Sequence, residues 1–134
     1  MKKILGAVLL VAACSSVVAA DDDEWIEYAT TPTDKFYLKK GTGEVINNKS
    51  GEEVFMAIHK NLDMKKKEIS FRKVYVRQKD CESGAGKVVF LYVGGNFDDE
   101  VDFVLGGGSV GSTLAEYLCS TYESVKREEQ EKSI

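Results

Sequence analysis

Most of this chain alternates between short apolar runs and polar turns. Runs rich in β-branched and aromatic residues, bounded by Gly, Pro, Asn or Asp, are typical of short strands. The pattern predicts strands at positions 25–28, 36–38, 54–59, 69–80, 88–93 and 101–105, with a further short one at 45–46. Strands at this spacing, joined by short polar turns, indicate an antiparallel meander.

The longest predicted strand changes its apolar parity along its length. Ile69 and Phe71 share one face, whereas Val74 and Val76 share the other. A change of parity within one strand predicts a bulge or a bend, and we place it near residues 72–73.

The apolar period becomes helical after the last predicted strand. Positions 114, 115, 118, 119, 122 and 125 form one apolar stripe of an amphipathic helix. Ser112 or Thr113 can act as the N-cap, and Thr113 with Glu116 fits a capping box. The charged run at 126–132 is expected to fray into solvent.

The first twenty residues have the layout of a bacterial secretory signal peptide. Lys2 and Lys3 precede an unbroken apolar run at 4–13, which is well short of the roughly 18 residues of a membrane-spanning helix. We therefore expect an exported protein of the periplasm, outer membrane or cell surface of a Gram-negative bacterium.

Two processing sites fit this segment. Cleavage after Ala20 would remove residues 1–20 and release a single domain over 21–134, and this is the favoured reading. The alternative is a lipoprotein signal over 1–13 with Cys14 lipidated as the new N-terminus. A membrane contact is expected only through such a lipid anchor, because no second segment is long enough to span a bilayer.

The remaining cysteines, Cys81 and Cys119, form an even pair in a compartment that permits disulfides. A disulfide between them is expected, with Cys119 on the buried helix stripe and Cys81 carried by the sheet. The predicted fold class is α+β: an antiparallel meander sheet of about six strands with one C-terminal helix packed on it and tied by the disulfide.

The charge balance argues against nucleic-acid binding. The net charge is −4, and loss of Lys2 and Lys3 with the signal makes the mature chain more acidic. The densest basic cluster is Lys65, Lys66 and Lys67, with Lys60 nearby, on a turn between two strands. Its ordinary interpretation is a solvated loop, and its functional one is a docking patch for an acidic polymer or protein.

No catalytic, cofactor or metal site is expected. The glycine-rich segment 106–113 matches GxGxxG, but it lacks the P-loop lysine and the later acidic strand of a dinucleotide fold. His59 is the only histidine, and no GxSxG elbow accompanies it, so it is expected to be structural or exposed. The acids at 98–102 lack the ligand spacing of an EF-hand and are typical of a solvated turn.

In the order of these features the chain resembles the surface-adhesin protein E family of Gram-negative bacteria. The shared features are Trp25, the strand of Tyr37, Asp80-Cys81 after a long strand, and a helix with Leu118-Cys119. The resemblance implies an exported, often lipidated protein that binds host matrix or plasma proteins such as vitronectin and laminin. A departure is the triple glycine at 106–108, where the family has a tighter entry to the helix.

The leading hypothesis is therefore a non-enzymatic envelope or surface protein that binds other macromolecules. A periplasmic structural or stress-related protein is the second hypothesis, and an inhibitor of an exported enzyme is the third. The sequence also leaves a homodimer as an alternative to a monomer. Exposure of the protein on the cell surface would favour adhesion over a role confined to the periplasm.

Overall fold

The computed structural model describes residues 24–132. The predicted signal segment, both processing sites and Cys14 lie outside the described residues. Within the described part the chain forms seven strands and two helices: β1 (Trp25–Thr30), β2 (Asp34–Lys39), β3 (Glu44–Asn47), β4 (Glu53–Asp63), β5 (Glu68–Arg77), α2 (Gln78–Ser83), β6 (Ala85–Leu91), β7 (Phe97–Val104) and α3 (Val110–Lys132).

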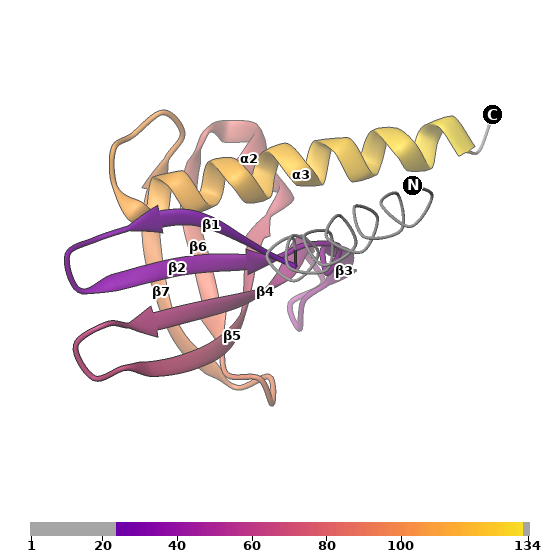
Figure 1. Ribbon diagram of the computed structural model, residues 1–134. Coiled ribbons are helices and arrows are strands. Elements are labelled where there is room, and N and C mark those ends of the chain that lie inside the picture. The colour runs from indigo at the N-terminus through magenta and orange to yellow at the C-terminus, as the bar shows by residue number, and fades with distance from the viewer. Residues whose placement is uncertain (1–23, 133–134) are drawn as a thin grey trace, which may run out of the picture.

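The strands form one antiparallel sheet in the order β1-β2-β4-β5-β6-β7, and β3 pairs with the other half of the β4 edge. The sheet bends strongly, so that β6 and β7 lie behind β1, β2, β4 and β5 (Figure 1). Helix α3 lies across the open side and contacts both edge strands, β1 and β7. The predicted α+β class, with one C-terminal helix on an antiparallel sheet, is confirmed.

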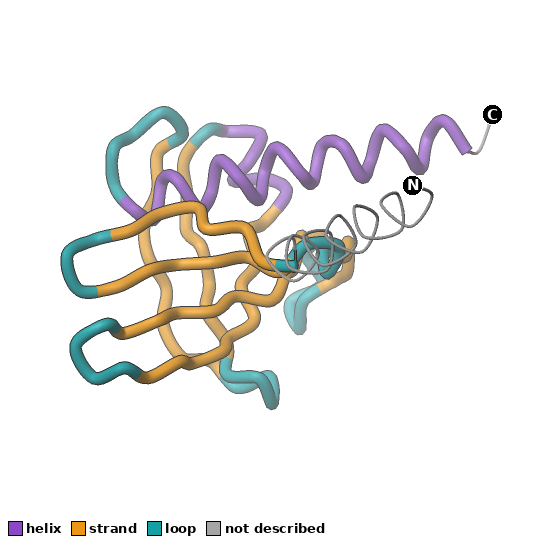
Figure 2. Tube along the Cα trace, viewed as in Figure 1, coloured by secondary structure: helices purple, strands orange, loops and turns teal. Residues whose placement is uncertain are grey.

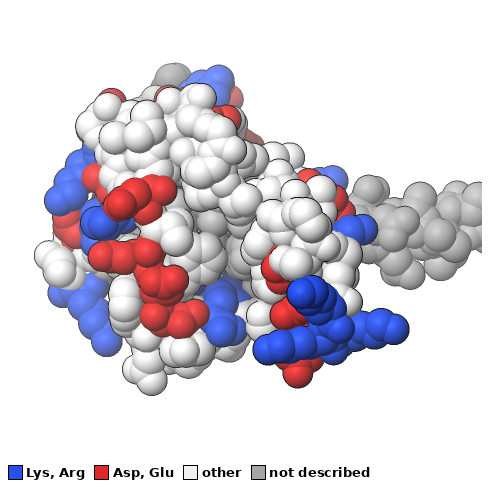
Figure 3. Space-filling model, turned by 90° about the vertical axis from the view of Figure 1, so that its left-hand side faces the viewer, with Lys and Arg blue, Asp and Glu red and all other residues white. Residues whose placement is uncertain are grey.

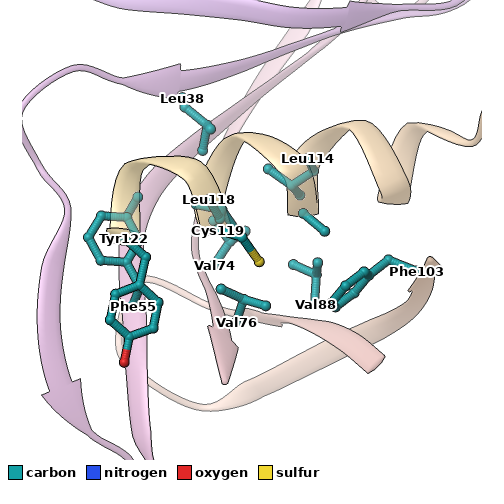
Figure 4. Packing of buried hydrophobic residues seen from close by; sticks show 12 residues of the cluster. Leu38, Phe55, Val74, Val76, Val88, Phe103, Leu114, Leu118, Cys119 and Tyr122 are labelled. Carbon is teal, nitrogen blue, oxygen red and sulfur yellow. The ribbon is translucent and has the colours of Figure 1, made fainter. Parts of the chain in front are cut away.

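The core fills the space between the concave face of this sheet and α3. The predicted helix stripe is confirmed, because Leu114, Ala115, Leu118, Cys119 and Tyr122 are all buried. They pack against apolar side chains of several strands, among them Phe55, Val74, Val76, Val88 and Phe103 (Figure 4). Figure 2 shows the helix crossing strands from both ends of the sheet, so one helix completes the core for the whole domain.

Of the two alternatives predicted near residues 72–73, a bulge or a bend, the bulge is wrong. Strands β4 and β5 pair without a register shift along the whole of β5, and the irregularities lie in β1 and at the end of β6. The parity changes because the two faces of β5 serve different purposes. Val74 and Val76 enter the core, whereas Ile69 and Phe71 lie on the outer face, 56% and 45% exposed.

The predicted strand 69–80 ends at Arg77, and α2 follows as a short helix. Its residues are polar and unbranched, apart from Cys81, so they favour a helical turn over a strand. Gly84 closes the turn in the left-handed conformation, with φ +86°. Cys81 therefore belongs to α2 and not to the sheet, and the predicted disulfide joins α2 to α3 with a Cα–Cα distance of 5.6 Å.

Helix α3 begins earlier and ends later than predicted. Ser109 is the capping side chain, because its Oγ accepts a hydrogen bond from the Ser112 backbone N–H at 3.0 Å. Glu116 accepts one from the Gly106 N–H at 2.7 Å instead of closing a capping box with Thr113. The charged end stays helical to Lys132 and projects beyond the sheet (Figure 1). No helix among residues 24–132 is long and apolar enough to cross a membrane.

One polar contact fastens α3 to the sheet beside the core. The Tyr122 hydroxyl donates to Glu53 Oε2 on β4, Lys126 Nζ lies 3.1 Å from the same oxygen, and the Tyr122 ring stacks on Phe55. We expect Tyr122→Phe to lower the free energy of unfolding by about 1 kcal/mol, because the lost bond is charge-assisted but half-exposed at its acceptor.

Urea denaturation of the variant checks this expectation. Tyr117→Phe is the matched control, because Tyr117 lies on the same helix with 39% of its surface exposed. An equal loss of stability in both variants would show that the Glu53 contact is not the cause.

Candidate functional site

A continuous cluster of lysine and aromatic side chains covers the outer face of the front strands. Strand alternation places it there, because the buried Leu38, His59 and Val74 turn their neighbours along β2, β4 and β5 to the opposite face. We call this surface the lysine–aromatic face. Its lysine and aromatic members are Trp25, Lys35, Tyr37, Lys39, Lys60, Phe71 and Lys73, and the register places Glu27 and Ile58 among them.

Lys60 lies at the centre of this face. Its Nζ is 4.4 Å from the ring centre of Trp25 and 4.5 Å from that of Tyr37. Trp25 also contacts the Phe71 ring, with a centroid distance of 5.9 Å, and has the Lys39 Nζ at 5.8 Å. Exposed cation–π contacts of this kind contribute about 0.5–1 kcal/mol each. They orient the lysine stems and hold the rings upright on the strands.

The lysines of this face carry uncompensated charge. None of Lys35, Lys39, Lys60 and Lys73 forms an ion pair with another described residue. The paired cations lie elsewhere and are Arg72, Arg77, Lys79, Lys87 and Lys126. A chain with a net negative charge thus concentrates free positive charge on one side of its sheet.

The predicted lysine patch is divided between two positions on the β4–β5 hairpin. Lys65, Lys66 and Lys67 form its exposed tip, where Asp63 Oδ1 accepts from the Lys65 and Lys66 N–H groups at 3.0 and 3.1 Å. Lys60 was predicted to lie on the turn, but it lies within β4, because this strand continues to Asp63. The tip lies at one end of the lysine–aromatic face, and Figure 3 shows basic side chains gathered at that corner.

The acidic run after the β6–β7 turn is split by strand alternation. Asp98 pairs with Arg72 on the concave side at 2.6 Å, whereas Asp102 pairs with Lys87 on the outer side at 2.6 Å. The Arg72 guanidinium holds the pKa of Asp98 below its ordinary value. Asp98 and Asp102 therefore pair with different cations on opposite sides of the sheet, and the run does not converge on one point.

His59 is neither exposed nor at the end of its strand. It lies within β4 with 3% of its surface accessible, beside Tyr28, whose hydroxyl is 2.8 Å from His59 Nε2. Burial, and then the charge of Arg72, lowers the His59 pKa to about 4. Its environment is a cavity on the concave side, away from the lysine–aromatic face.

Sequence reasoning found the lysines of the hairpin but missed the aromatic half of the site. The sequence pattern assigns Trp25 and Tyr37 to strands without a face, and it places Phe71 opposite Val74 and Val76 without relating it to the lysines. The missed signal is the alternation itself: Tyr37 and Lys39 flank the apolar Leu38, so both must leave the core. Neither protein-family models nor curated proteins nor solved structures gave a match to this chain.

Proposed function

We propose that this is an exported, non-enzymatic envelope protein that binds an acidic segment of another protein across the lysine–aromatic face. The observation that carries the proposal is the set of unpaired lysines interleaved with half-exposed aromatic rings on a rigid sheet. The resemblance to the surface-adhesin protein E family supplies the first partners to test, which are host matrix or plasma proteins such as vitronectin and laminin.

The physical chemistry of the face suits such a partner. Tryptophan and tyrosine are the residues that most often dominate the energy of a protein interface, because they bury large areas at a small cost in side-chain entropy. Lysines around them steer an acidic partner and accelerate its association. The rings and lysines stand on hydrogen-bonded strands, so little ordering is needed on binding.

We expect Lys39→Gln/Lys60→Gln/Lys73→Gln to bind immobilised vitronectin and laminin about tenfold more weakly than the wild type. Three solvent-facing ionic contacts, each contributing about 0.5 kcal/mol, sum to that factor. Lys65→Ser/Lys66→Ser/Lys67→Ser, at the hairpin tip, should weaken binding as well. Surface plasmon resonance at low and moderate salt measures both effects. Added salt should reduce the difference in affinity between the wild type and each variant.

The matched control is Lys49→Gln/Arg127→Gln/Lys132→Gln, which removes the same charge from the β3–β4 turn and the end of α3. It should bind like the wild type. An equal loss in the control would assign the effect to net charge and contradict the lysine–aromatic face. Absence of saturable binding by the wild type would contradict adhesion and leave a periplasmic role, which surface labelling of intact cells tests independently.

A further inference from the structure

The concave side of the sheet holds a cavity that the lysine–aromatic face does not use. It opens at the end of the molecule that carries the β1–β2 and β4–β5 turns, where Figure 3 shows a hollow in the surface. Its volume is about 430 Å³, within the range of small-molecule sites. Apolar side chains from four elements line it, among them Phe36, Phe90, Val101 and Leu114.

His59 lines this cavity from within an aromatic cage. Its ring centroid is 5.6 Å from that of Tyr28, 6.2 Å from Phe36 and 5.3 Å from Phe90. Its Nε2 is paired with the Tyr28 hydroxyl. Its Nδ1 is buried and has no hydrogen-bond partner among the described residues. A buried polar atom left in that state costs about 1–3 kcal/mol, so an acceptor that reached it from the cavity would stabilise the folded protein.

The hydrogen bond to Tyr28 decides which kind of partner is needed. If Tyr28 donates to Nε2, only the Nδ1–H of a neutral imidazole is left unsatisfied. If Nε2–H donates instead, both the Tyr28 O–H and the Nδ1 lone pair are left without partners, since Tyr28 has no other hydrogen bond among the described residues. The first arrangement leaves fewer buried groups unpaired, so His59 offers an N–H donor.

The polar groups around this donor are neutral or paired, so the cavity does not require a charged ligand. Burial keeps both His59 and Tyr28 in their neutral forms, since it lowers the pKa of the first and raises that of the second. Arg72, which also lines the cavity, is paired with Asp98 at 2.6 Å. The cavity therefore combines apolar walls, the polar side chains of Asn61 and Ser70, a neutralised ion pair and one buried unsatisfied donor.

We propose that this cavity binds a compact, mostly apolar small molecule with one carbonyl oxygen, which accepts a hydrogen bond from His59 Nδ1. The apolar body of the ligand lies against Phe36, Phe90 and Leu114. Such a site is independent of macromolecule binding, because β4 presents His59 and Lys60 on opposite faces of the sheet.

The experiment uses two probes of similar size, benzamide and toluene, of which only benzamide has the acceptor oxygen. The chain has one histidine, so ¹⁵N-histidine labelling gives resonances of His59 alone. We expect the free protein to show a protonated Nδ1. Benzamide should shift that resonance in a saturable way, whereas toluene should bind without an equivalent shift.

Tyr28→Phe/His59→Phe separates the hydrogen bond from the cavity. Replacing both polar partners with rings of similar shape is close to neutral for folding. Toluene should bind this variant about as tightly as it binds the wild type, whereas the ratio of benzamide to toluene affinity should fall at least tenfold. Ser70→Phe, which fills the cavity, should abolish both interactions, and Ser120→Phe on α3 should abolish neither.

Three results would overturn the proposal. The first is a His59 resonance pattern with a deprotonated Nδ1, and the second is a resonance that does not respond to benzamide at any concentration. The third is an unchanged ratio of affinities in Tyr28→Phe/His59→Phe.

Discussion

Replacing Cys81 and Cys119 together with alanine should lower the free energy of unfolding by about 3–4 kcal/mol. The bond closes a loop with a sequence separation of 38 residues, and the loss of loop entropy in the unfolded chain accounts for that magnitude. A domain of this size has a total stability of about 5–15 kcal/mol, so the change is large. Urea or guanidinium denaturation of the oxidised wild type and the double variant measures it.

The loss should be concentrated around α2. This helix has no buried residue of its own, so the disulfide holds it to the folded body together with the polar contacts of Lys79 and Asp80. Hydrogen exchange should therefore show faster exchange in α2 of the variant than in β4 or β5. Reductant should destabilise the wild type by a similar amount and leave the double variant unchanged. Equal unfolding midpoints for the oxidised wild type and the variant would contradict a stabilising role of the bond.

The fold was largely predictable because two periods in the sequence agree with the layers of the structure. Val88 lies in a continuous apolar run of strand length, Phe103 lies in an alternating one, Leu114 and Leu118 follow helical spacing, and all four are buried in one core. What escaped prediction is the local competition at strand ends. The predicted strand continued past Arg77 to position 80. The residues after Arg77 have no apolar side chain to bury against the core, apart from Cys81, and they form α2 instead.

The binding surface was predictable only in part, for a physical reason. A run of lysines at 65–67 is visible in the sequence, whereas the cluster around Lys60 is assembled from β1, β2, β4 and β5 and depends on strand register. Trp25 contacts Phe71 although two other strands lie between β1 and β5. The cavity was even harder to predict from the sequence, because it depends on the bend of the sheet, which brings Phe90 close to His59.

Lowering the pH from 7 to 5 should reduce the free energy of unfolding by about 2 kcal/mol, through His59 alone. Its pKa is lowered from 6.5 to about 4 in the folded protein, mainly by burial. Between these two values the unfolded chain binds a proton that the folded protein does not, so acid favours unfolding. The stabilisation is complete above pH 6.5 and is lost as the pH falls towards 4. Denaturant titrations at half-unit pH steps measure the slope.

The carboxylates do not cause a comparable loss of stability between pH 7 and 5. The hydrogen bond from Tyr122 lowers the pKa of Glu53 from its ordinary value of 4.5, and that from Arg72 lowers the pKa of Asp98 from 3.8, so their contribution is lost only below those values. Tyr28→Phe/His59→Phe should therefore show a nearly flat stability between pH 7 and 5. A variant as pH-sensitive as the wild type would exclude His59 as the cause. A flat profile in the wild type would mean that His59 takes up its proton without unfolding, which the apolar cage around it opposes.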